Sequence, residues 1–349
     1  MSNRSERLSE ILPCAAHFLV DFTCTALLTA ACVGVRGISA ALCAVVYNAL
    51  AFAMQLPIGY LADRVHLRRT LAAGGCAMVA AGSLLAHPLA LCAAVGLGNA
   101  CFHAGAGREA LQRGGARTGR VGRFVAPGAI GIFLGPLAAD VFLLTRRFAP
   151  LSLVVCALLL LAQKQEKPKK LPREAQLSLS PARRAALTVC MFLTVLLRSY
   201  MGTVTRYAAL SAPVFAAAMT LCVFLGKFFG GSLADRFGAV RFQLPAQLAG
   251  TALFALSVWV PALGLPAALL FNTTMALTVH TLYRSAPARA GTMFGVTTLA
   301  LYLGVLPRLL GAPNLLFTWW GLTLCGLVSA ALLLGGLRLA QKGERAVAC

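Results

Sequence analysis

Charge is scarce in this chain, and negative charge is scarcest. Asp, Glu, Lys and Arg make up 12% of the 349 residues, with 10 acidic residues against 31 basic ones. A soluble domain carries roughly 25% charged residues, so a water-soluble fold of this size is excluded. The chain is 59% hydrophobic with a mean hydropathy of +0.80, which indicates a membrane protein.

Strict alternation of apolar and polar residues is also absent. A membrane β-barrel needs segments of ~10 residues that alternate in this way. Stretches such as LSLVVCALLLLA (residues 151–162) are instead apolar almost throughout. We therefore expect an all-α polytopic membrane protein.

Several motifs of enzymes and cofactor proteins are missing. The sequence holds no GxxxxGK[ST] phosphate loop, no CxxC pair and no Cys/His spacing typical of a metal site. Most of the 12 cysteines lie inside apolar runs, where they behave as small hydrophobic residues. We expect no metal, no cofactor and no ATP-driven chemistry. A membrane enzyme acting on lipid is a remote alternative, because His17 and Asp21 are the only close acid–base pair within a span.

Apolar windows of ~20 residues predict twelve membrane-spanning helices. With the N-terminus in the cytoplasm, most basic residues fall in cytoplasmic segments, which fits the positive-inside rule. These charges then face anionic lipid headgroups, so nucleic acid is not an expected partner. The expected spans are residues 11–33, 38–61, 70–86, 88–107, 121–143, 147–163, 185–206, 208–230, 242–261, 263–280, 291–306 and 314–338.

One long polar segment, residues 163–184, divides the spans into two sets of six. It is charged and contains proline, so we expect an extended, mobile cytoplasmic linker between an N-terminal bundle (1–162) and a C-terminal bundle (185–349). A short charged phrase follows the second span of each set: GYLADRVHLRR at 59–69 and GSLADRFGAVR at 231–241. This duplication predicts two pseudo-symmetric six-helix bundles.

The repeated phrase resembles the signature of the major facilitator superfamily, found between helices 2 and 3 with an echo between helices 8 and 9. An Asp at such a helix–loop junction can cap a helix or pair with Arg, and so hold the bundles shut on the cytoplasmic side. A plain basic loop with a topological role is the alternative. The predicted gate comprises Gly59, Asp63, Arg64, Arg68, Gly231, Asp235, Arg236 and Arg241.

The fifth span, VGRFVAPGAIGIFLGPLAAD (residues 121–140), resembles the antiporter motif of exporters in this superfamily. Closely spaced glycines allow tight helix contact, and a proline within the membrane kinks the span. The pattern favours export, with ordinary packing of small residues as the alternative. Its residues are Gly122, Gly131, Gly135 and Pro136.

Local matches resemble the fosmidomycin-resistance branch of the superfamily and suggest a divergent relative. They are HFLVDFTCTALL (17–28), GNACFHAGAGREAL (98–111), LRSYMGT (197–203) and GTMFGVTTLALYLG (291–304). The branch does not define the substrate, because these segments depart from its usual pattern at Ala104 and after helix 10.

Ionisable residues within spans are costly and mark candidate functional positions. His17 and Asp21 are four residues apart and share a helix face. We hypothesise that Asp21 carries the coupling proton and that His17 shares or orients it. A structural hydrogen bond between the two is the alternative.

A second set of residues is expected to make the substrate cavity electropositive and to favour an anionic or zwitterionic substrate. The basic residues of this set are Arg198, His103 and Arg108, and the acidic Glu109 is expected to line the same cavity. Each has a simpler explanation: Arg198 can snorkel to the outer surface, Arg108 and Glu109 can form a cytoplasmic charge cluster, and His103 can bond a neighbouring helix.

These observations together predict a secondary transporter rather than an enzyme. We expect a monomeric, proton-coupled exporter of a small organic compound, anionic or drug-like, in the plasma or inner membrane with both termini cytoplasmic. Import of an organic anion by symport is the alternative, and a transport-inactive sensor or scaffold is a third class.

Overall fold

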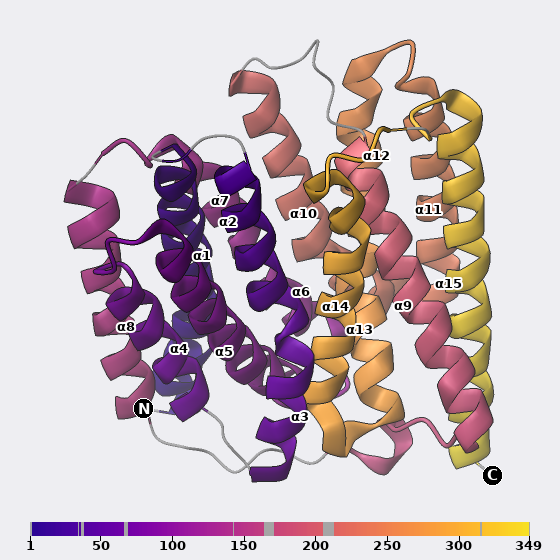
Figure 1. The fold of residues 1–349 in the computed structure, drawn as a ribbon. Coiled ribbons are helices and arrows are strands. Elements are labelled where there is room, and N and C mark those ends of the chain that lie inside the picture. Colours follow the sequence, from indigo (N-terminus) through magenta and orange to yellow (C-terminus); the bar gives the residue numbers. More distant parts are fainter. Residues whose placement is uncertain are drawn as a thin grey trace.

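The protein is mostly helical in the part that its computed structural model describes, which comprises residues 2–33, 35, 38–65, 69–141, 143–163, 171–204, 213–314 and 316–348 (Figure 1). The N-terminal half contains α1 (Ser2–Val33), α2 (Ile38–Asn48), the π-helical η1 (Ala49–Ala53), α3 (Gln55–Val65), α4 (Arg69–Gly82), α5 (Pro88–Gly114), α6 (Thr118–Val125), α7 (Pro127–Leu137), η2 (Leu144–Phe148) and α8 (Ala149–Ala162). The C-terminal half contains η3 (Arg173–Ala175), α9 (Pro181–Val204), α10 (Pro213–Phe237), α11 (Ala239–Leu256), η5 (Pro261–Leu263), α12 (Gly264–Asn272), α13 (Thr274–Ser285), η6 (Pro287–Arg289), α14 (Ala290–Leu309) and α15 (Trp319–Ala348).

These elements account for all twelve expected spans. Nine segments of the described chain are long and apolar enough to cross a membrane. The other three are α4, which has only 14 residues, the α6–α7 pair, and α11, which carries Arg241 and two glutamines. The seventh span begins at Pro181, four residues before the expected boundary, because proline at the first helical position needs no hydrogen-bond acceptor.

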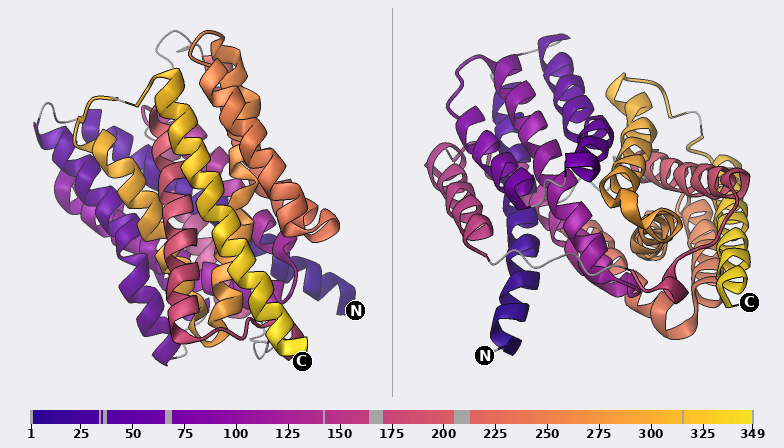
Figure 2. Two further views of the ribbon diagram at one scale, coloured as in Figure 1. Left: turned by 90° about the vertical axis from the view of Figure 1, so that its right-hand side faces the viewer. Right: turned by 90° about the horizontal axis from the view of Figure 1, so that it is seen from below.

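The two halves of the chain form two bundles that lie side by side (Figures 1 and 2). Helices α1 to α8 form one bundle, and α9 to α15 form the other. Both chain termini lie at the same end of the molecule (Figure 1). We call this end the terminal face; α3, α5, α8, α10 and α13 also end there.

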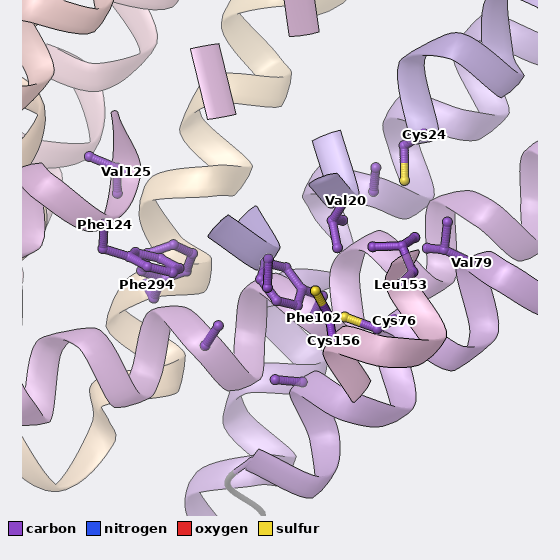
Figure 3. Close-up of a cluster of buried hydrophobic side chains, with 14 of the residues drawn as sticks. Val20, Cys24, Cys76, Val79, Phe102, Phe124, Val125, Leu153, Cys156 and Phe294 are labelled. Atoms are coloured by element: carbon purple, nitrogen blue, oxygen red, sulfur yellow. The ribbon is translucent and has the colours of Figure 1, made fainter. Parts of the chain in front are cut away.

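Small and sulfur-containing side chains fill the core of the N-terminal bundle. Cys76 of α4 and Cys156 of α8 lie beside Phe102 of α5, and Cys24 of α1 belongs to the same cluster (Figure 3). The cluster continues into the other bundle, because Phe124 of α6 contacts Phe294 of α14 with ring centroids 6.4 Å apart. Helices can approach this closely because the side chains between them are small.

Gly75 shows how tight the α4–α5 contact is. A Cβ at Gly75 would meet the backbone of Gly98 and Phe102, whereas one at the neighbouring Gly74 would meet nothing within 4 Å. We expect Gly75→Val to cost about 1–3 kcal/mol or more, since backbone cannot move aside as a side chain can. Gly74→Val is the matched control. Thermal unfolding in detergent should show a lower midpoint for the first variant only; equal midpoints would contradict this packing.

The described part of the linker is docked rather than free. The backbone N–H of Leu177 donates to the carbonyl of Arg284 at 3.0 Å, and that of Ser178 donates to Gly343 at 3.3 Å. Leu171, Leu177 and Leu179 are buried. The expectation of a mobile linker is therefore wrong for residues 171–180, because Leu177 and Leu179 pack on apolar side chains of the C-terminal bundle.

Candidate functional site

Four polar side chains meet in the interior of the N-terminal bundle, and we call them the Asp21 cluster: His17 and Asp21 of α1, and Asn99 and His103 of α5. Nε2 of His17 lies 3.2 Å from one carboxylate oxygen of Asp21, and Nε2 of His103 lies 3.5 Å from the other. Asn99 donates to the same carboxylate at 3.3 Å. All four residues are buried.

The tautomers of both histidines follow from their second contacts. Nδ1 of His17 lies 2.7 Å from the carbonyl oxygen of Phe124, and Nδ1 of His103 lies 3.0 Å from that of Asn99. A carbonyl oxygen only accepts, so both Nδ1 atoms carry hydrogen and donate. Each Nε2 of a neutral ring then presents a lone pair to the Asp21 carboxylate. Both contacts become favourable only when a proton lies between the nitrogen and the oxygen, so the cluster offers two positions for an exchangeable proton.

A charged side chain of the opposite bundle lies near Asp21. It is Lys227 of α10, whose positive charge acts on both Asp21 and His103. The titratable side chains that act on Asp21 from the elements packed around it are His17, Cys24, Tyr47, His103 and Lys227.

The same atoms could also hold a metal ion. The ligating atoms of His17, Asp21 and His103 lie within 4.8 Å of one another, and no other such group occurs among the described residues. A metal ion would take the positions of the two protons, so the two occupants exclude each other.

Helix α7 of the fifth span packs against α1 through glycines, so the backbone of α7 lies directly against the Asp21 cluster. A Cβ at Gly128 of α7 would meet the Asp21 carboxylate and the His17 ring. Gly131 and Gly135 lie in the same way against the α1 backbone. The glycine spacing recognised in the sequence therefore positions the cluster, and this packing by itself sets no direction of transport.

Two other motif residues of this span have different roles. Gly122 packs against the backbone carbonyl of Lys227, so it lies at the contact between the bundles. The bend expected at Pro136 is found instead at Ala126, because Pro127 lacks the N–H that would continue the helix. Pro136 lies in the last turn of α7, where the helix ends anyway.

The C-terminal bundle contributes two cations to the interior. Arg198 of α9 is 6% exposed and donates to Thr274 Oγ1 at 3.1 Å and to the sulfur of Met275 at 2.7 Å. Lys227 is half-buried, and the charges of Arg198 and Lys227 act on each other. Snorkelling of Arg198 is wrong, because its guanidinium is enclosed and bonded to α13.

Asp63 joins the bundles at the terminal face. Its carboxylate accepts from the backbone N–H of Gly291 at 3.0 Å and of Thr292 at 2.8 Å, which are the first amides of α14. The Thr292 hydroxyl and Arg108 Nε each donate to it at 2.9 Å. Gly59 allows this approach, since a Cβ there would meet the backbone of Gly291. Asp63 thus caps a helix of the opposite bundle.

Asp235, in the second copy of the phrase, makes the equivalent contact from the C-terminal bundle to the N-terminal bundle. Its two oxygens accept from the backbone N–H of Thr118 at 3.1 Å and of Gly119 at 2.9 Å, at the start of α6. Gly231 lies against the backbone of Thr118. Each bundle therefore caps a helix of the other with an Asp, and we call these two contacts the paired latches.

His280 of α13 adds a third contact between the bundles. Its Nε2 donates to the carbonyl of Gly115 at 2.8 Å, so its Nδ1 accepts from the Thr118 hydroxyl at 3.1 Å. A cavity of ≈ 330 Å³ lies next to it and is lined in part by Thr118, Asp235, His280, Arg284 and Glu344. The cavity lies at the terminal face and away from Asp21, so we do not assign the substrate to it.

Comparison with known proteins agrees with this arrangement. The family model described as the Major Facilitator Superfamily matches residues 14–307. The chain belongs to the Major Facilitator Superfamily. It is therefore a multi-pass membrane transporter and not an enzyme. No curated protein matches the sequence.

Solved structures of the superfamily share the fold at low identity. The E. coli fucose:proton symporter FucP superposes with a TM-score of 0.67 at 15% identity, covering 96% of this chain and 99% of that one. FucP in the outward conformation gives 0.66 at 15% identity, with 97% and 100% covered. The human organic anion transporter MFSD10 gives 0.63 at 17% identity, with 96% and 98% covered.

The remaining predicted residues lie at the terminal face of this transporter. Arg108 binds Asp63, and Glu109 binds Arg69 at 2.9 Å and Arg113 at 2.8 Å. The assignment of Arg108 and Glu109 to the substrate cavity is therefore not kept, because both residues have partners in this ion-pair network.

The arginines of the repeated phrase lie outside the latches. Arg64 stacks on Tyr60 with its guanidinium 4.4 Å from the ring centre, and Arg236 lies 5.3 Å from that of Phe237. Arg241 is exposed. Arg68 lies outside the described residues. Asp63, Asp235 and the glycines beside them make the latch contacts between the bundles.

Sequence reasoning missed the roles of Asn99, Lys227 and His280. Asn99 is four residues before His103, so helical spacing could have placed it beside the cluster. Lys227 and His280 were visible as polar residues in spans. Their partners lie in the opposite bundle, and no local pattern names such a partner.

Proposed function

We propose that this protein is a proton-coupled secondary transporter that moves a small organic compound by alternating access. The single observation that carries the proposal is the Asp21 cluster. It is a buried carboxylate between two histidines whose geometry requires protons, and it lies where a cation of the other bundle acts on it. Among the described residues, Asp21 is the only carboxylate in the middle of a membrane helix.

The paired latches supply the gate of the proposed cycle. We place the terminal face in the cytoplasm, because its connections carry most of the basic residues. With Asp63 and Asp235 both engaged, the cytoplasmic side of the proposed transporter is closed. Breaking both latches would let the bundles rock and open the cytoplasmic side.

Two directions of transport each have a supporting observation. The fifth-span pattern resembles that of exporters, and export by proton antiport is the direction we propose. Import by symport is the second candidate, because Arg198 and Lys227 leave an excess of positive charge near the cluster. A proton and an anion would then bind together more readily than either alone.

Proteoliposomes with an imposed pH gradient test the proposal. The full-length protein is given a panel of anionic and neutral organic compounds, with the gradient applied in each sense. The compound should accumulate against its concentration gradient for only one sense of the pH gradient. Accumulation against the direction of proton flow indicates antiport, and accumulation along it indicates symport. A chelator should leave accumulation unchanged, because protons and not a metal ion occupy the cluster. Transport indifferent to the gradient would contradict proton coupling.

His103 is expected to supply one of the two proton positions. In His103→Gln the contact of His17 with Asp21 remains, so coupled transport should persist with a weaker dependence on pH. The slope of log rate against pH should fall from about two to about one in magnitude. Asn99→Ala, which removes a donor that does not titrate, is the control and should keep the steeper slope. Equal slopes for wild type and His103→Gln would assign His103 a structural role.

A further inference from the structure

The two interior cations of the C-terminal bundle lack a counter-charge. No carboxylate among the described residues bonds Arg198, whose partners are a hydroxyl and a thioether. No hydrogen bond or ion pair engages the Lys227 ammonium in the described part of the chain. Burying a guanidinium without an anion is costly, and a neighbouring like charge raises that cost. A purely structural role would favour an apolar side chain at either position.

The protein's own acids are not free to compensate these cations. Asp21 lies between two histidines, while Asp63 and Asp235 cap helices at the terminal face. Glu109 binds two arginines there. None of these four acids bonds Arg198 or Lys227, so an anion from outside the chain can take that position.

We propose that Arg198 and Lys227 bind the oxyanion group, a carboxylate or a phosphate, of the transported compound. This inference rests on the proposed function and names its substrate class. Arg198 donates to two partners on α13, one from each terminal nitrogen, so its planar fork keeps donors for two oxygens of one anion. Lys227, which is half-buried, supplies a point charge from α10.

The position of Lys227 links anion binding to the proton. Lys227 acts on Asp21 from across the bundle contact. A proton on the Asp21 cluster removes the negative charge that competes with an external anion for Lys227. The anion therefore binds more tightly to the protonated cluster, and by thermodynamic linkage the proton binds more tightly when the anion is present. This coupling favours symport, the second candidate direction.

Thermal unfolding of the purified full-length protein in detergent tests the site with simple anions in place of the transported compound. The probes are acetate and inorganic phosphate, compared with tetramethylammonium chloride at equal ionic strength. At least one oxyanion should raise the unfolding midpoint of the wild type. Arg198→Gln and Lys227→Gln should weaken its apparent affinity by about tenfold or more. Lys342→Gln, which removes an exposed positive charge, is the control and should bind as the wild type does.

Further variants separate this inference from a folding defect and from the proposed function. Arg198→Lys keeps the charge and should keep a weaker shift. Asp21→Asn should keep the shift but lose transport driven by a pH gradient. No oxyanion-specific shift in the wild type, or an undiminished shift in both glutamine variants, would overturn the anion site. Transport by the wild type that does not respond to the pH gradient, with the oxyanion shift intact, would overturn only the proposed function.

Discussion

Asp21→Asn is expected to reduce accumulation driven by a pH gradient to the level of empty vesicles. The amide has the shape of the carboxyl but cannot take up and release a proton, so the energy of the gradient no longer reaches the substrate. Exchange of labelled for unlabelled substrate at equal pH should persist, because that half of the cycle needs no net proton movement. Uptake by proteoliposomes measures both activities in one preparation.

Asp140→Asn is the matched control for this prediction. Asp140 is an exposed acid beyond the end of α7, so its loss changes the net charge equally without touching the cluster. Full pH-driven accumulation by Asp21→Asn would exclude Asp21 as the coupling group. Loss of exchange together with accumulation would show that Asp21 has a structural role.

Asp63→Asn is expected to open the cytoplasmic side. The carboxylate accepts four hydrogen bonds, and bonds to a charged group contribute roughly 1.5–3 kcal/mol each. The Asn side chain has an NH2 group in place of one carboxylate oxygen. At least one of the four donors that bond Asp63 would then face another donor, and that contact would be repulsive. A loss of about 1.4 kcal/mol already changes a two-state equilibrium tenfold. Hydrogen exchange at the start of α14 should therefore speed up by roughly tenfold or more.

Hydrogen exchange at the second latch tests whether the two latches act together. If Asp63 and Asp235 hold one interface, Asp63→Asn should also speed exchange at Thr118 and Gly119, and Asp235→Asn should speed it at Gly291 and Thr292. Exchange in α15, which packs on α9 and α11, should stay unchanged in both variants. Acceleration confined to the amides next to each mutated residue would mean that the two Asp are local caps and do not gate the transporter.

The architecture could be predicted from the sequence, because this architecture depends on composition and repetition. Low charge and long apolar runs required membrane helices, and the two copies of the phrase required two related bundles. The i, i+4 spacing also brought His17 and Asp21 together correctly, since four residues make about one helical turn. Such features are local or periodic, so they can be read along the chain.

The rest of the site depends on contacts between distant residues. Asp63 was recognised as a gate residue, but the amides that it caps lie 228 and 229 residues away. His103 reaches Asp21 because α1 and α5 pack together, and Lys227 reaches it because α10 packs on the fifth span. Arg108 and Glu109 were assigned to the substrate cavity from their closeness to His103, yet the further course of α5 carries them to the terminal face. Helix packing decides these positions, and no single helix encodes it.

The flow of protons driven by substrate tests the central claim most directly. Proteoliposomes that hold a pH-sensitive dye and start without a pH gradient are given an inward gradient of a transported compound from the panel. The wild type should change the internal pH as the compound enters, whereas Asp21→Asn vesicles preloaded with unlabelled compound should take up labelled compound by exchange without any change in pH. Entry of the compound through the wild type at constant internal pH would contradict proton coupling at the Asp21 cluster.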